Sequence, residues 1–144
     1  MILSRSATYG LRAVLFLSLH SEKNERFGVK TIAKELDFPE SYLGKVLQNL
    51  VRKGIISSMK GPRGGFFLDV ESLNRPVIQI VEAIDGLERF SACGLGLHEC
   101  SDDKPCPIHK EYGALRDGLF NLLSQKTIAD FKKDIEEGRA IIAL

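Results

Sequence analysis

The 144-residue sequence has no apolar stretch long enough to span a membrane and no recognisable secretion signal. Its richest apolar run, residues 13–19, is interrupted by Ser18 and falls short of the roughly 18 apolar residues that a spanning helix needs. The first residues lack a basic region followed by an apolar segment and a small-residue cleavage site. We therefore expect a protein with no membrane association that works in the reducing cytoplasm.

Two motifs typical of enzymes are also missing, namely a Cys-x-x-Cys pair and a nucleotide-binding motif. No internal repeat or low-complexity tract is present either. The chain is therefore expected not to be an enzyme. Its three cysteines are few and odd in number, which in a reducing compartment argues against a disulfide framework and favours metal or redox chemistry.

The net charge of +1 conceals an asymmetry between the two halves. Residues 1–70 contain 11 lysines and arginines against 6 acidic residues, whereas residues 71–144 contain 9 against 13. A basic half joined to an acidic half is typical of a DNA-binding module attached to a sensing or assembly module, although chance asymmetry is an alternative. We predict a DNA-binding domain over 1–70, and a linker helix, a cysteine-rich loop and dimerisation helices over 71–144.

Hydrophobic periodicity predicts helices over residues 6–20, 29–37 and 39–53. Ser4 or Ser6 is a candidate cap of the first helix, and Gly54 is a good left-handed cap for the third. Pro39 suits the first turn of the third helix. The face of this helix that is opposite its apolar rows carries small, polar or basic side chains that can enter a major groove: Ser41, Gly44, Lys45, Gln48, Asn49 and Arg52.

A hairpin is predicted next, with strands over residues 55–59 and 66–68. Lys60 and Arg63 lie at its tip among three glycines and a proline, so the tip can approach a phosphate backbone or a minor groove. An ordinary surface hairpin is the alternative, but its position directly after a polar-faced helix favours DNA contact. Together these elements predict a winged helix-turn-helix.

The second half is predicted to be helical, with a helix over 76–84, a longer one over about 107–124 and a last helix capped by Thr127. The long helix carries Tyr112, Leu115, Leu119, Leu122 and Leu123 on one face. The predicted fold class is therefore mainly α with a small β-hairpin wing, plus a long dimerisation helix. Two-fold symmetry would place two recognition helices roughly 34 Å apart, about one DNA turn.

All three cysteines and two of the three histidines fall within the seventeen residues from Cys93 to His109. Thiolates with an imidazole favour zinc or an iron-sulfur cluster over hard cations. Cys93, Cys100, Cys106 and His109 would suit a two-iron, two-sulfur centre or a closed tetrahedral zinc site. Three unliganded thiols in a mobile loop are the remaining alternative.

His109 is the best fourth ligand on geometric grounds. If Cys106 caps the long helix, Pro107 is its first residue and His109 its third, so that Cys106 and His109 share one turn. The positive end of the helix dipole would favour thiolate there. His98, the competing ligand, is expected to be solvated.

Several motifs together resemble the Rrf2 family of bacterial winged helix-turn-helix regulators, some of which sense cluster status, nitric oxide or redox state through an iron-sulfur cluster. The resemblance covers nearly the whole chain. Its most specific parts are Tyr9-Gly-Leu-Arg-Ala, Ser41-Tyr-Leu, Lys53-Gly-Ile-Ile-Ser-Ser and Lys60-Gly-Pro-Arg-Gly-Gly-Phe, together with the cysteine segment.

The resemblance implies a homodimer that binds palindromic double-stranded operator DNA. It implies groove contacts at or near Ser41, Tyr42 and Lys45, to which the exposed face adds Gln48, and a wing at Lys60 and Arg63. It also implies a cluster on Cys93, Cys100 and Cys106, with His109 in the place of a histidine found in the family member that regulates cluster biogenesis. A cluster-free regulator controlled by a partner protein or small ligand is an alternative within the family, and a zinc-binding regulator is another.

Two positions depart from the family pattern. The gap between Cys93 and Cys100 is six residues where the family commonly has five. In nitric-oxide-sensing members an acidic residue near the start of the first helix supplies a ligand to the partner's cluster, and the matching residue here is Thr8, a poor iron ligand. A two-iron cluster is therefore favoured over a four-iron cluster.

Overall fold

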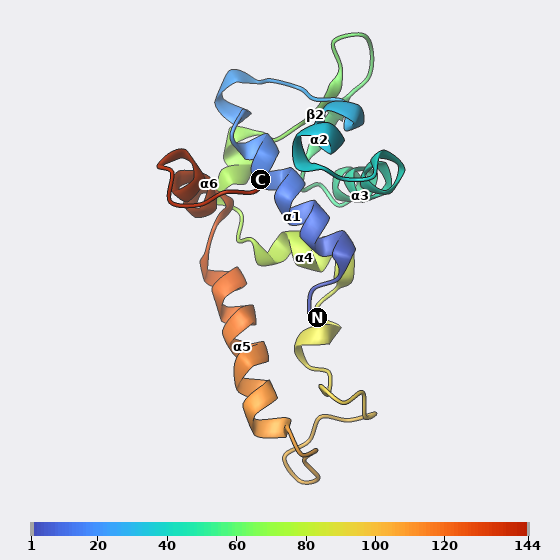
Figure 1. Ribbon diagram of the computed structural model, residues 1–144, viewed down its shortest axis with the longest axis vertical. Helices are drawn as coiled ribbons and strands as arrows, with labels where there is room; N and C mark the ends of the chain where they lie inside the picture. Colours follow the sequence, from blue (N-terminus) through green and yellow to red (C-terminus); the bar gives the residue numbers. More distant parts are fainter. Residues whose placement is uncertain (1, 144) are drawn as a thin grey trace.

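The computed structural model describes residues 2–143, which form a mainly helical fold with one two-stranded hairpin (Figure 1). This confirms the predicted fold class. The elements in chain order are α1 (Arg5–Ser18), η1 (Ser21–Lys23), α2 (Val29–Leu36), α3 (Glu40–Arg52), β1 (Ser57–Met59), β2 (Gly65–Phe67), η2 (Val70–Asn74), α4 (Ile78–Asp85), η3 (Glu88–Phe90), α5 (His109–Gln125) and α6 (Ile128–Glu136). None of the helices in this part of the chain is both long and apolar enough to cross a membrane.

Helix α1 is the centre of the core. It is apolar around most of its circumference, and it packs against α2, α3, α4 and α6. Ala13, Val14 and Leu17 are almost completely buried. Of the two candidate caps, Ser4 takes this role, because its Oγ accepts a hydrogen bond from the backbone N–H of Ala7 at 3.0 Å.

The turn between α2 and α3 is fastened by two residues of α1. Phe38 lies in this turn, and its ring stacks on Tyr9 with the ring centroids 3.9 Å apart. The guanidinium of Arg12 lies over the Phe38 ring, 4.3 Å from its centroid. It also donates a hydrogen bond to the carbonyl of Leu36 at 3.0 Å. The Tyr9-Gly-Leu-Arg sequence therefore sets how α2 and α3 sit on α1.

Some element boundaries differ from the predicted ones. Helix α3 begins at Glu40, with Pro39 just before it. The first hairpin strand is two residues shorter than predicted, because Ile55 and Ile56 pack in the core outside the ladder, and the second strand is shifted by one residue. The segment between the hairpin and α4, for which the periodicity predicts no helix, contains the short helix η2. These differences follow from apolar patterning, which marks burial but not hydrogen-bond pairing.

The hairpin is extended by a third short segment. Ser57 pairs with Phe67 and Met59 with Gly65, while Phe27 exchanges two backbone hydrogen bonds with Phe66, of 2.9 and 2.8 Å. Gly65 has φ +142°, and a Cβ there would lie 2.7 Å from the backbone of Phe27. A side chain at this position would separate the hairpin from the body, so the wing depends on this glycine.

Helix α5 runs away from the body and carries the cysteine loop, residues 91–108, at its far end, opposite the wing (Figure 1). Only part of its predicted apolar face is buried. Leu123 is 5% exposed, but Leu122 is 47% and Leu115 is 71% exposed. The chain itself therefore leaves apolar side chains of α5 in contact with solvent.

The crossing of α1 and α4 yields a stability prediction. A Cβ at Gly10 would lie 2.2 Å from Cδ1 of Ile84, so Gly10→Ala should destabilise the protein by about 1–3 kcal/mol despite the better helix propensity of alanine. Ile84→Val removes that methyl carbon and should restore much of the loss in the double variant. The measurement is the free energy of unfolding from urea titrations.

Gly44→Ala is the matched control. A Cβ at Gly44 would make only an ordinary contact, 3.7 Å from Val29, so this change should be neutral or slightly stabilising. If Gly10→Ala and Gly44→Ala are equally stable, the close crossing of α1 and α4 is not a constraint on the fold.

Candidate DNA interface and cysteine loop

Helix α3 presents a polar, basic surface to solvent. Ser41, Lys45 and Gln48 are all exposed, as is Arg52 on the last turn. Asn49 is predicted to belong to this surface, but it does not. Its side-chain amide is half-buried and donates to the carbonyl of Ala83 at 3.2 Å. Asn49 thus fixes α3 to α4 and is not free for a base edge.

Tyr42 lies at the border between the core and this surface, with 37% of the residue exposed. Its ring packs edge-on against Tyr9 at a centroid distance of 5.3 Å. Its hydroxyl is 2.5 Å from Oγ of Ser6 in a hydrogen bond between α3 and the first turn of α1. The side chain is therefore held in position while its outer edge stays accessible.

The tip of the hairpin carries two exposed cations, Lys60 and Arg63. Gly61 has φ +106°, and its carbonyl accepts from the backbone N–H of Gly64 at 2.9 Å, which closes the turn. Helix α3 and the hairpin both lie in the half of the molecule remote from the cysteine loop (Figure 1).

The cysteine loop brings its thiols together in an ordered arrangement. Backbone N–H groups of Leu95 and Leu97 point at the Cys93 sulfur and lower the pKa of this thiol, because they stabilise the thiolate. Cys106 is 9% exposed, and its thiol is another of the neighbouring groups that lower the pKa of Cys93. Cys93 and Cys106 are therefore neighbouring soft donors.

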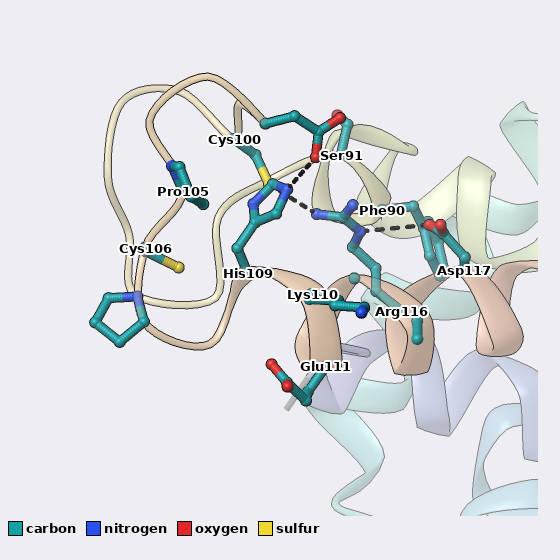
Figure 2. Close-up of a pocket in the computed structure, with 14 residues that line it drawn as sticks. Phe90, Ser91, Cys100, Pro105, Cys106, His109, Lys110, Glu111, Arg116 and Asp117 are labelled. Atoms are coloured by element: carbon teal, nitrogen blue, oxygen red, sulfur yellow. Dashed lines mark hydrogen bonds and ion pairs between the residues drawn. The ribbon is translucent and has the colours of Figure 1, made fainter.

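Cys100 and His109 form a second pair. The Cys100 sulfur is 3.4 Å from Nδ1 of His109, and the opposite ring nitrogen, Nε2, is 2.8 Å from a carboxylate oxygen of Asp102 (Figure 2). The His109 side chain is 19% exposed. Asp102 therefore sets the orientation of the imidazole, with Nδ1 turned toward the sulfur.

The predicted relation between Cys106 and His109 is wrong. Helix α5 begins at His109 itself, with Ile108 as its cap, because Pro107 and Ile108 form a turn before it. The backbone N–H of His109 does donate to the Cys106 carbonyl at 3.0 Å, but its ring faces Cys100. His109 is thus brought to the cysteines by the turn and not by a shared helical turn with Cys106.

The sequence does not predict two functional candidates, namely Asp102 in the loop and Arg116 on α5. Arg116 donates from Nη1 to the carbonyl of Ala92 at 2.8 Å. The same nitrogen lies 3.5 Å from the Cys100 sulfur (Figure 2). This hydrogen bond to Cys100 raises the pKa of Arg116. Arg116 follows His109 by seven residues, a spacing that places both on one helix face and could have revealed it.

The donors do not converge on one point. Within residues 2–143, no group of three or more His, Cys, Asp or Glu side chains is arranged to hold a single metal ion. Cys100, Cys106 and His109 instead share a cavity of about 930 Å³ with Arg116. Cys93 is a neighbour of Cys106. His98 is exposed, as expected.

An exposed polar helix followed by a basic-tipped hairpin defines a winged helix-turn-helix DNA-binding protein. The chain belongs to the Rrf2 family, described as iron-dependent transcriptional regulators, whose profile matches residues 3–134. It is a DNA-binding transcriptional regulator and not an enzyme, as predicted.

Two relatives show the extent of the similarity. A helix-turn-helix-type transcriptional regulator of Aquifex aeolicus is 33% identical over 132 residues, which are 90% of each chain. The regulator IscR of Vibrio atlanticus is 26% identical over 136 residues, which are 94% of this chain and 78% of the relative.

Solved structures share the fold. CymR, the global cysteine regulator of Bacillus subtilis, matches with a TM-score of 0.74 at 22% identity over 91% of this chain and 95% of its own. IscR of T. potens matches with a TM-score of 0.73 at 22% identity over 96% of this chain and 91% of its own. The winged helix-turn-helix architecture is therefore common to these regulators.

The exposed wing yields a prediction for DNA binding. Arg63→Ala should weaken DNA affinity and reduce the slope of log affinity against log salt concentration by about one, because one phosphate contact is lost. Fluorescence anisotropy over a range of salt concentrations measures both quantities. Lys133→Ala removes an exposed cation from α6 and should leave the slope unchanged. An unaltered affinity and slope for Arg63→Ala would remove the wing from the DNA interface.

Proposed function

We propose that this regulator senses iron-sulfur cluster, redox or nitric oxide status through a two-iron, two-sulfur cluster held by Cys93, Cys100, Cys106 and His109. In this proposal residues 1–70 bind DNA and residues 71–144 carry the sensing loop and the dimer contacts. When bound, the cluster supplies a one-electron redox centre that responds to oxidants and to iron supply.

The pairing of the ligands is the observation that carries the proposal. A two-iron cluster takes four protein ligands, two on each iron. The loop presents two such pairs, Cys93 with Cys106 and Cys100 with His109. Single tetrahedral zinc would need all four donors around one point, and within residues 2–143 no three donors are arranged in that way. The pairs favour a binuclear centre over zinc.

The surroundings of the two pairs suit an anionic cluster. Backbone N–H groups already stabilise thiolate at Cys93. Asp102 on Nε2 leaves Nδ1 of His109 as the nitrogen that would face iron, the usual arrangement of a carboxylate behind a ligating histidine. Residue 94 is a glycine at the point where Tyr112 covers the loop. A Cβ at this position would lie 2.8 Å from the Tyr112 ring.

Thr8 supports two irons over four. Its hydroxyl donates to the carbonyl of Arg5 at 2.8 Å within the first turn of α1. A neutral hydroxyl that is already bound to the backbone is a poor replacement for an acidic iron ligand. A ligand from the partner subunit at this position is therefore disfavoured, and the chain would supply all four ligands itself.

The proposed DNA interface combines α3 and the wing. Ser41, Tyr42, Lys45 and Gln48 would lie in or beside the major groove, and the wing would place Lys60 and Arg63 against the backbone or minor groove. Their exposure on the surface, together with the bond that steadies Tyr42, supports this assignment. A homodimer would present two such surfaces to a palindromic operator.

A chain of contacts connects the cysteine loop with α3. Short helix η3 leads into the loop, and its Arg89 donates to the carbonyl of Ile2 at 3.4 Å. Asp85, at the end of α4, accepts hydrogen bonds from both the backbone N–H, at 3.0 Å, and the hydroxyl of Ser4. Ser6, half a turn further on, bonds Tyr42 of α3. A change in the loop that moved η3 would thus be transmitted to the start of α1 and to the recognition helix.

Metal analysis and DNA binding test cluster sensing. Protein purified without oxygen should contain about two iron atoms and two acid-labile sulfides per chain. Cys100→Ala should lose most of both, whereas His98→Ala, which changes an exposed histidine of the same loop, should retain them. Operators would be selected from random duplex DNA, and the affinity of the loaded protein should differ from that of Cys100→Ala for at least one of them.

Each alternative has its own result. Stoichiometric zinc without sulfide would indicate a zinc-binding regulator. Absence of both iron and zinc would indicate a cluster-free regulator controlled by another ligand. Full iron and sulfide with equal affinities for every selected operator would contradict sensing while leaving cluster binding intact.

Exposed leucines of α5 test the dimer. Leu115→Glu combined with Leu122→Glu should shift the protein from dimer to monomer, because two charges would be buried at the proposed contact without partners. Sedimentation velocity at several concentrations measures the shift. Ile141→Glu is the control, since Ile141 is 71% exposed, like Leu115, but lies in the C-terminal segment. A wild-type monomer, or a dimer that survives the double change, would rule out this interface.

A further inference from the structure

The side chain of Arg116, on α5, packs against the cysteine loop and is only 11% exposed. A buried guanidinium is costly unless anions or carbonyl oxygens surround it. Asp117 lies 3.6 Å from its Nε, with much of the aspartate in solvent. The other contacts of Arg116 go to the loop, which indicates that the loop is the reason for its burial.

The two loop contacts of Arg116 lie at well-separated points of the chain. Nη1 donates to the carbonyl of Ala92, directly before Cys93, and also lies against the sulfur of Cys100. One nitrogen on a rigid helix therefore holds both ends of the segment between the first two cysteines. A planar guanidinium is suited to such a shared contact, whereas a lysine ammonium would be a single mobile point charge.

We infer that Arg116 is the positioning residue of the cysteine loop, tying Ala92 to Cys100 against α5, and that its charge favours the reduced form of a cluster bound there. The second half of this inference rests on the proposed function. Reduction adds a negative charge to the centre, and a cation at a ligand sulfur stabilises the more negative state. Other charges around the cavity, on Asp102, Lys110, Glu111 and Asp117, are exposed and more strongly screened.

Two measurements on the full-length protein separate positioning from charge. The first is amide hydrogen exchange of residues 92–106 in metal-free protein, with the amides of α3 as an internal reference. The second is the reduction potential of the reconstituted cluster. The variants are Arg116→Ala, which removes both the tie and the charge, and Arg116→Lys, which keeps only the charge. Lys110→Ala is the control, because Lys110 lines the same cavity from an exposed position.

Arg116→Ala should raise loop exchange by about tenfold or more, as expected for the loss of a charged hydrogen bond, and should make the reduction potential more negative. Arg116→Lys should also exchange faster but keep a potential near that of the wild type. Lys110→Ala should match the wild type in exchange.

Unchanged exchange in Arg116→Ala would overturn the positioning role. Equal potentials in the alanine and lysine variants would overturn the role of the charge. If the wild type takes up no iron, the proposed function fails and the role of the charge falls with it, but hydrogen exchange still decides whether Arg116 anchors the loop.

Discussion

The crossing of α1 and α4 is the constraint on which the arrangement of the molecule depends. Gly10 allows Ile84 to approach α1 more closely than any side chain would permit. With α4 seated there, Asn49 can reach the carbonyl of Ala83, and Asp85 can bind Ser4. The same helix is therefore bonded both to α1 and to the recognition helix. A small displacement at this crossing would alter the DNA-reading surface and the path to the loop together, because packed interfaces shift between discrete arrangements and do not deform continuously.

This arrangement also bears on the proposed coupling between the loop at one end of the molecule and DNA at the other. The loop touches neither α3 nor the wing, which lie in the opposite half (Figure 1). It is instead held at both of its ends by rigid elements: η3 precedes it, with Phe90 packed on Phe120 of α5, and α5 follows it. Communication through helices requires only that the loop has two states with different free energies of contact to these helices.

Much of the fold could be predicted from the sequence, because buried faces repeat with the period of a helix and glycine and proline mark the turns. The positions of α1, α3 and the hairpin follow from such patterns. The predicted start of α5 lies two residues before the observed one, since Pro107 is typical of a first helical turn but here lies in the turn before the helix. Contacts across the loop have no period at all. The bond between Asp102 and His109 has no sequence signal, whereas the spacing of Arg116 from His109 follows the helix and would have allowed its prediction.

If Cys93 with Cys106 and Cys100 with His109 are the ligand pairs of a cluster, as proposed, their arrangement has a consequence for what the loop would sense. If each iron takes one pair, Cys93 and Cys106 close the loop at its base, near α5, while Cys100 and His109 connect its middle to the first residue of that helix. Loss of either pair would free a different part of the loop. Release of Cys100 and His109 would leave the tie between Arg116 and Ala92 as the contact that still holds the start of the loop to α5. The free-energy difference between the cluster-loaded and empty states of the loop would then be smaller than if the empty loop became fully disordered. A smaller difference is sufficient, because a coupling of about 1–3 kcal/mol already changes operator affinity 5- to 150-fold. A loop that stays partly anchored when empty would lose less entropy on reloading, which would make the proposed switch readily reversible.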